Sequence, residues 1–178
     1  MLISEIEKGL ERFKGKINKV HEIVFYYNIA YLFLGSGDYN KSLFWLNKIL
    51  NTTDVDVRLD ILSYARILNL IVHYELGNND ILEYTVISTY RFLYARKRLY
   101  KFETILLNFI RKLPKSFTQV ELINSFVDLR TELITLSENS FEKKALEYFD
   151  LISWLESKIN KTTYAEVIKS KIINSDKV

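Results

Sequence analysis

The sequence predicts an all-α protein built from stacked antiparallel helix hairpins, because it is rich in apolar residues and poor in turn residues. Apolar residues make up 48% of the 178 residues, which is enough for a core and too many for a disordered chain. A β-rich chain needs turn residues about every 8–12 positions, and this chain has one Pro and five Gly. Long helices with short connections account for this composition.

Candidate helix ends divide the chain into about eight or nine helices. Gly37, Gly77 and Pro114 are stop signals. Thr118–Glu121 and Thr163–Glu166 are capping boxes, in which the Thr hydroxyl accepts from the Glu amide and the Glu carboxylate accepts from the Thr amide. Between these marks apolar residues recur every three or four positions. The expected helices cover residues 3–14, 17–36, 39–51, 56–76, 79–96, 99–113, 118–137, 140–159 and 163–173.

The run 79–113 has neither Gly nor Pro. We expect a break near residues 96–98 because the run is long for a single helix of a globular protein.

Two segments share one plan, in which a long helix, a short Gly-containing turn and a second helix follow each other. They cover residues 23–51 and 56–96, with Gly37 and Gly77 at the equivalent place in each turn. A glycine there can take the positive φ that ends a helix. Each hairpin has an apolar face that it buries only by stacking on a neighbour. We expect a single domain over residues 1–178, with less regular helices over 99–173.

The first unit resembles a tetratricopeptide repeat. That family has a characteristic order of aromatic, aliphatic, small and glycine positions, filled here by Tyr26, Ile29, Ala30, Phe33, Gly37, Tyr39 and Ser42. Ser42 stands where the family prefers Ala, and the second unit keeps only Gly77 and the helical pattern. The resemblance implies a right-handed superhelix of hairpins that binds a protein or peptide partner.

The whole chain is also similar to the C-terminal part of larger, uncharacterised bacterial helical-repeat proteins, most clearly over residues 90–102 and 141–150. This resemblance implies no activity. It leads us to expect that Met1 marks a boundary within a longer array, and that the chain is the C-terminal part of a larger protein or assembly.

The tetratricopeptide resemblance implies a partner-binding groove along the first helix of each unit. The corresponding residues are Tyr27, Tyr31 and Leu34 in the first unit and Tyr64, Ile67, Ile71 and Tyr74 in the second. An apolar groove rich in Tyr suits an amphipathic helix or an extended peptide. None of these positions is Lys, Arg or Asn, so the clamp with which chaperone-binding members hold a terminal carboxylate is not expected. Alternatively, neighbouring helices fill the groove and make these residues part of the core.

Positive charge is concentrated in residues 90–115, which hold eight Lys and Arg residues against Glu103 alone, in a chain of net charge +3. On a helix, Tyr90 and Tyr94 share one side with a candidate basic patch made of Arg91, Lys97, Arg98 and Lys101. The patch could be a solubilising face or a surface for an acidic protein partner. It could also bind nucleic acid, although the modest total charge disfavours this. Acids from residues 138–147 could fold over it.

No residue pattern points to catalysis, a metal or a cofactor. The chain has no Cys, and neither His21 nor His73 has a Glu or His at metal-ligand spacing. His73 fits a packing role, with a role as ligand or base as the alternative. Phosphate-binding loops and nucleophile elbows are absent from the sequence. We therefore expect a non-catalytic protein with neither metal nor organic cofactor.

Sequence features also bear on localisation. The N-terminus lacks the basic and apolar regions of a signal peptide. The longest uncharged stretch, residues 23–37, is shorter than the roughly 20 residues that cross a bilayer. These features favour a soluble, cytoplasmic protein.

Overall fold

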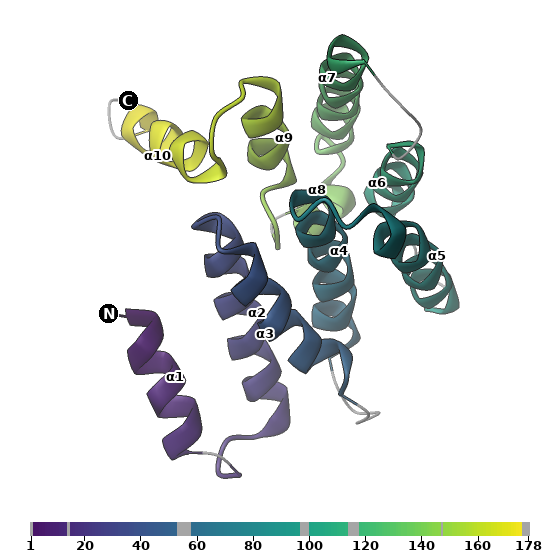
Figure 1. Ribbon diagram of the computed structural model, residues 1–178. Helices are drawn as coiled ribbons and strands as arrows, with labels where there is room; N and C mark the ends of the chain where they lie inside the picture. The colour runs from purple at the N-terminus through teal and green to yellow at the C-terminus, as the bar shows by residue number, and fades with distance from the viewer. Residues whose placement is uncertain are drawn as a thin grey trace.

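The computed structural model describes residues 2–13, 15–52, 58–96, 100–113, 118–146 and 148–175, which form α-helices and connecting turns without a β-strand (Figure 1). The all-α prediction is confirmed. In this part of the chain the helices are α1 (Leu2–Arg12), α2 (Lys19–Gly35), α3 (Tyr39–Leu50), α4 (Leu59–Glu75), α5 (Asn79–Ala95), α6 (Lys101–Lys112), α7 (Gln119–Leu136), α8 (Ser140–Leu146), α9 (Leu151–Ile159) and α10 (Tyr164–Ser175).

Helices that follow one another along the chain pack against one another from α2 to α7. The C-terminal helices then turn back, so that α9 packs between α7 and α10. Helices α9 and α10 lie beside the ends of α2 and α4 (Figure 1). Tyr164 of α10 contacts Tyr31 of α2, and Trp154 of α9 contacts Tyr74 of α4. The C-terminal helices α9 and α10 therefore pack against α2 and α4.

The two predicted hairpins, α2–α3 and α4–α5, have the same kind of turn. The amides of Gly37 and Asp38 donate to carbonyls in the last turn of α2, at 3.0 and 2.9 Å. Gly77 and Asn78 make the equivalent bonds after α4, both at 3.0 Å. Both glycines have positive φ, +80° at Gly37 and +69° at Gly77, which other residues adopt only with strain. The prediction that these glycines end helices is confirmed.

The helices of the first hairpin cross where two small residues meet. Ala30 of α2 and Ser42 of α3 are both fully buried, and the Ser42 hydroxyl donates to the Ala30 carbonyl at 2.7 Å. A hydroxyl at this position therefore finds an acceptor instead of remaining unpaired in the core.

The capping boxes at Thr118 and Thr163 are both present. The Thr118 amide donates to Glu121 at 2.8 Å, and the Thr163 amide donates to Glu166 at 2.9 Å. In return, each Thr hydroxyl accepts from the Glu amide, at 3.3 and 3.2 Å. These local signals set the starts of α7 and α10.

The expected single helix over 140–159 is wrong, because α8 ends at Leu146 and α9 begins at Leu151. Asp150 caps α9 by accepting from the Ser153 amide at 2.9 Å. The connector also brings Phe149 into the core, where it is 5% exposed. This division raises the number of helices in the described residues to ten. The predicted break near Arg96 is present, since α5 ends at Ala95.

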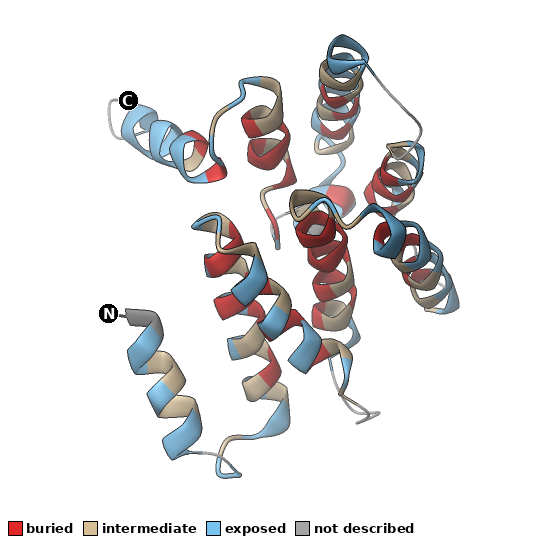
Figure 2. Cartoon of the chain, in the orientation of Figure 1, coloured by how far each residue is buried: buried red, intermediate tan, exposed pale blue. Residues whose placement is uncertain are grey.

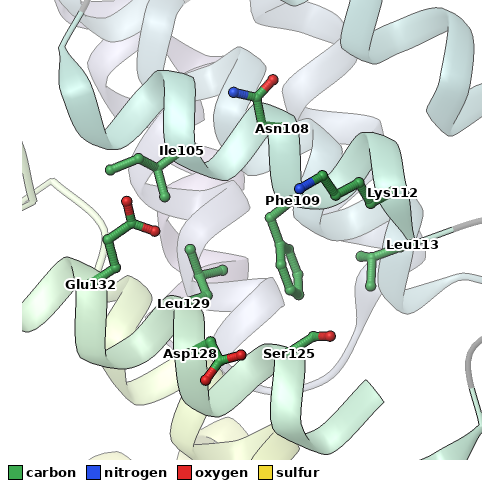
Figure 3. A pocket seen from close by; sticks show the side chains of 9 residues that line it. All are labelled: Ile105, Asn108, Phe109, Lys112, Leu113, Ser125, Asp128, Leu129 and Glu132. Carbon is green, nitrogen blue, oxygen red and sulfur yellow. The ribbon is translucent and has the colours of Figure 1, made fainter. Parts of the chain in front are cut away.

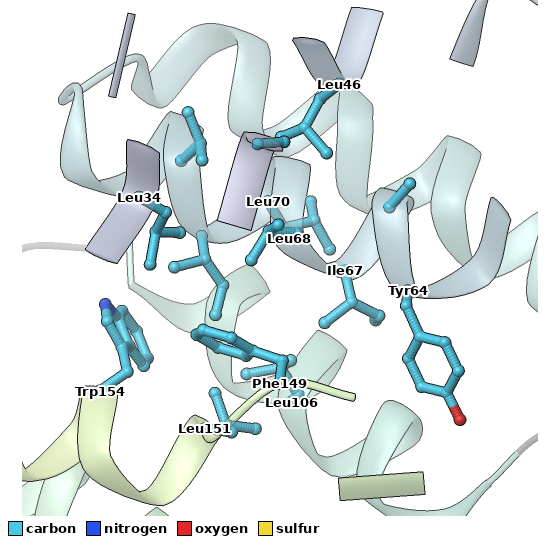
Figure 4. Packing of buried hydrophobic residues seen from close by; sticks show 14 of the residues in the cluster. Leu34, Leu46, Tyr64, Ile67, Leu68, Leu70, Leu106, Phe149, Leu151 and Trp154 are labelled. Atoms are coloured by element: carbon cyan, nitrogen blue, oxygen red, sulfur yellow. The ribbon is translucent and has the colours of Figure 1, made fainter. Parts of the chain in front are cut away.

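The core is centred on α4, of whose 17 residues eleven are buried (Figure 2). One hydrophobic cluster contains side chains from α2 through to α10. Figure 4 shows Phe149, Leu151 and Trp154 packed against side chains of α2 and α4, such as Leu34 and Leu68. Within the described residues, no helix is both long enough and apolar enough to span a membrane.

Candidate interaction surfaces

The seven groove residues expected from the sequence lie together on α2 and α4, where they form part of the core. Five are buried, namely Tyr27, Leu34, Tyr64, Ile67 and Ile71, and Tyr31 and Tyr74 are half-buried. The structure thus places these residues on one shared face, as the hairpin pattern predicts. The C-terminal part of the chain covers that face.

The connector between α8 and α9 covers the middle of this face. The ring of Tyr148 stacks on Tyr64, with ring centres 4.0 Å apart. The Tyr27 hydroxyl donates to the Tyr148 carbonyl at 2.9 Å, which satisfies both polar groups. Burial raises the pKa of Tyr27 and of Tyr64 above the ordinary tyrosine value. These tyrosines therefore remain protonated and act as packing residues with a hydrogen-bonding tip.

Helices α9 and α10 cover the end of the same face. Trp154 packs edge-on against Tyr74, and its indole N–H donates to a Glu75 carboxylate oxygen at 2.6 Å. Lys158 approaches the same oxygen at 2.5 Å, so the partly buried carboxylate is paired with a cation. The hydroxyls of Tyr31 and Tyr164 lie 2.7 Å apart. A partner could reach the five buried groove residues only after these helices and the connector moved away, whereas Tyr31 also lines an open pocket between α2 and α10.

Two of the four basic-patch residues lie in the described part of the chain. Arg91 is exposed on the last third of α5, and Lys101 is exposed at the first residue of α6. Lys97 and Arg98 lie outside the described residues. The neighbouring Arg96 faces inward and donates to both carboxylate oxygens of Glu103, at 2.9 and 3.0 Å. Arg96 is therefore part of a buried ion pair.

A distant acid does fold over the start of α6, but it bonds backbone amides. Glu142 of α8 accepts from the amides of Lys101 and Phe102, at 3.0 and 3.3 Å. These amides have no partner within their own helix, and a carboxylate is favourable at a helix N-terminus. Burial raises the pKa of the neighbouring Glu103, and the Arg96 charge opposes this shift. Glu142 thus ties α8 to α6.

The most exposed aromatic surface is the outer face of α5, which we define by Tyr84, Ile87, Tyr90 and Tyr94. Their exposed fractions are 77%, 44%, 45% and 67%, whereas the opposite side of the helix buries Leu82, Val86, Thr89 and Leu93. The rings of Tyr90 and Tyr94 stack with centres 6.0 Å apart. The sequence candidates include neither Tyr84 nor Ile87. Their three- and four-residue spacing was a usable signal, but the same spacing is typical of a core stripe.

A cleft of about 450 Å³ separates the outer face of α5 from α6. Its lining comes from both helices: Val86, Ile87, Tyr90 and Arg91 from α5, and Thr104, Leu107, Asn108 and Arg111 from α6. Arg91 and Arg111 are exposed, and neither forms an ion pair with a carboxylate of the described residues. The cleft therefore offers two free cations beside apolar side chains.

A second cleft, of about 350 Å³, lies between α6 and α7 (Figure 3). Phe109 points into its centre from α6, and Asp128 and Glu132 line it from α7, across from Lys112. The charged groups can form hydrogen bonds and ion pairs with a partner. In the described residues, no three His, Cys, Asp or Glu side chains gather as a metal site would need.

His73 lies in the last turn of α4. It is 7% exposed, and its Nδ1 lies 3.2 Å from the side-chain nitrogen of Asn78. Burial lowers the pKa of His73, which favours the neutral ring. The side chain therefore packs against the core and bonds within the turn.

The chain was compared with protein-family models, with curated proteins and with solved structures. None of the three comparisons found a match. The tetratricopeptide resemblance thus rests on the residues and turns of the two hairpins alone, and the described residues form an all-helical protein of ten helices.

Proposed function

We propose that this chain is a non-catalytic protein–protein interaction scaffold of the tetratricopeptide type, and that its partner binds the outer face of α5. The observation that carries the proposal is the exposure of Tyr84, Ile87, Tyr90 and Tyr94 along one side of a helix whose other side is buried. Clustered exposed apolar side chains are typical of interaction sites. Tyrosine is also enriched among the residues that dominate binding energy at interfaces.

The tetratricopeptide type is supported by the two consecutive hairpins. Their turns make the same hydrogen bonds around Gly37 and Gly77, and consecutive helices pack from α2 to α7. A right-handed superhelix, extended through a larger protein or assembly, is the finer part of this proposal. The second hairpin then presents α5 outward.

The choice of α5 over the α2–α4 groove follows from what a partner would displace. Phe149 and Trp154 are 5% and 1% exposed and belong to the same hydrophobic cluster as α4. Moving them into water would cost about 1.5–3 kcal/mol for each large apolar side chain. A partner on α5 incurs no such cost, because its contact side chains are already exposed.

The test is an affinity capture from the native host with the wild-type chain and two variants, followed by quantitative mass spectrometry. Tyr84→Ser with Tyr94→Ser changes the outer face of α5. Ile172→Ser changes another exposed apolar residue, which lies on α10 and is 56% exposed. We expect a defined set of proteins to bind the wild type and the α10 variant and to be lost with the α5 variant. If the Ile172 variant alone loses them, the partner surface is on α10 and the assignment to α5 is wrong.

A further inference from the structure

The cleft between α5 and α6 combines an apolar floor with a polar rim. Val86 and Leu107 line the cleft and are 3% and 2% exposed, so little of their surface reaches solvent. On α6, the spacing of Thr104, Asn108 and Arg111 puts all three on one side of the helix. At 1.5 Å per residue they extend over roughly 10 Å. The rim can therefore contact several consecutive residues of a bound chain.

The charge in this cleft is positive, and no acid of the described residues pairs with it. Arg91 enters from α5 and Arg111 from α6, and neither pairs with an acid among the described residues. The nearby Arg96 differs, because Glu103 neutralises it inside the fold. Two guanidinium groups are thus available for a ligand.

The chemistry that fits this arrangement is a chain that carries both carboxylates and apolar side chains. A guanidinium can hold a carboxylate through two parallel N–H···O bonds. The apolar floor favours a side chain that leaves water, and Tyr90 adds ring surface with a polar tip. We infer that the cleft binds an acidic, partly apolar segment of a partner protein, held by Arg91 and Arg111. This inference rests on the proposed function, since it names the partner chemistry for the same surface.

Single-stranded nucleic acid is the competing occupant, because phosphates bind Arg and bases stack on Tyr. One observation favours the acidic peptide. Affinity for nucleic acid grows with the number of phosphates that cations neutralise, and this cleft supplies only two cations from its lining residues.

The test begins with a phage-displayed library of random peptides of about 12 residues, which would be about three turns if helical. The library is selected on the immobilised wild-type chain, and an enriched peptide is synthesised with a fluorescent label. Its affinity is then measured by anisotropy for the wild type, for Arg91→Glu with Arg111→Glu, and for Lys143→Glu with Lys169→Glu. The last variant has the same change of charge at two exposed lysines outside the cleft.

We expect enriched peptides with at least two acids beside an apolar residue. Their affinity should fall about tenfold or more in the arginine variant and less than about twofold in the lysine variant, and it should weaken as salt screens the charges. A peptide with Lys in place of each acid should bind the arginine variant better than the wild type. If the arginine variant unfolds, Arg91→Gln with Arg111→Gln replaces it, with the same expected loss.

Three results would overturn the inference. The enriched peptides could lack an excess of acids, or the lysine variant could lose as much affinity as the arginine variant. Labelled oligo-dT or oligo-rU could bind with an affinity that depends on Arg91 and Arg111 while no acidic peptide is enriched, which would assign the cleft to nucleic acid.

Failure of this inference is distinguishable from failure of the proposed function. If captured host proteins depend on Tyr84 and Tyr94 but are retained by the arginine variant, the interaction surface stands and the acidic ligand is wrong. If the tyrosine variant retains every captured protein, the proposed surface is wrong, whatever the peptides show.

Discussion

The ring of Tyr148 lies parallel to the ring of Tyr64, with the centres 4.0 Å apart and the planes within 10°. Tyr64 belongs to α4, and Tyr148 belongs to the connector between α8 and α9. Their contact closes the face that a tetratricopeptide groove would leave open. Tyr64 is 6% exposed as a result, whereas Tyr84 on the next helix is 77% exposed.

These two tyrosines give a matched test of the closed groove. Tyr64→Ala should cost about 3–5 kcal/mol of unfolding free energy, because it leaves a cavity in the core. Tyr84→Ala should change it by about 0.5 kcal/mol or less, because the side chain is in water. Urea denaturation of both variants measures the difference. Similar small losses would mean that the connector does not pack on α4.

Ala30 tests the crossing of α2 and α3. It is fully buried, and its carbonyl accepts from Ser42 of the facing helix. Ala30→Leu should overpack this contact and cost about 1–3 kcal/mol. The control is Ala165→Leu on α10, where the alanine is exposed. There the same substitution should lower the unfolding free energy by only about 0.2–0.3 kcal/mol. Equal melting temperatures for the two variants would show that the helices do not cross at Ala30.

The ion pair between Arg96 and Glu103 tests whether the basic segment is partly structural. Arg96→Met leaves a buried carboxylate without its cation and should cost about 3–5 kcal/mol near neutral pH. Arg91→Met, on the exposed side of α5, should cost about 0.5 kcal/mol or less. Chemical denaturation of both variants provides the comparison.

The cost of Arg96→Met should also depend on pH, through Glu103. Burial raises the pKa of Glu103, and removal of Arg96 takes away the charge that opposes this shift. A carboxyl group with a raised pKa in the folded state destabilises the fold as pH rises through that value. The stability that the variant loses relative to the wild type should therefore become smaller as pH falls toward 4.5, the ordinary pKa of a glutamate. A loss of stability that does not change with pH would exclude Glu103 as the cause of that loss.

Glu166 should show the opposite pH dependence. Hydrogen bonds from the Thr162 hydroxyl, and from the Thr163 amide and hydroxyl, lower the pKa of Glu166 to about 2. A lowered pKa means that its stabilising contribution is present above 4.5 and is lost as pH falls toward 2. The carboxyl resonance of Glu166 in an NMR titration measures this pKa. A midpoint near 4.5 would show that the cap of α10 does not form.

Local signals in the sequence predict much of this fold, because each of them acts within a few residues. Gly37 and Gly77 end their helices with positive φ, and the Thr118 and Thr163 boxes start theirs. The tetratricopeptide resemblance, and not a local signal, supplies the seven groove residues, which share one face of α2 and α4. The division of residues 140–159 was not predicted, because Phe149 leaves the helical path to enter a core formed by distant helices.

The candidate site was predicted only in part. The spacing of Arg91, Tyr90 and Tyr94 indicates an exposed side of a helix, and these residues are exposed in the structure. The contribution of Arg111 depends on how α6 packs against α5, and nothing near it in the sequence indicates a shared cleft.

The sequence by itself determined the helical class, the two hairpins and most helix ends, since periodicity, glycine conformation and capping are local properties. Tertiary structure alone decided which apolar face remained exposed. Tyr148 and Trp154 cover the face of α2 and α4, although their own positions are far along the chain. The stripe on α5 has a similar spacing, but no helix of the described residues covers it, because the C-terminal helices pack against α2 and α4. Periodicity shows that a helix has an apolar side, whereas burial depends on long-range packing, which no local pattern encodes.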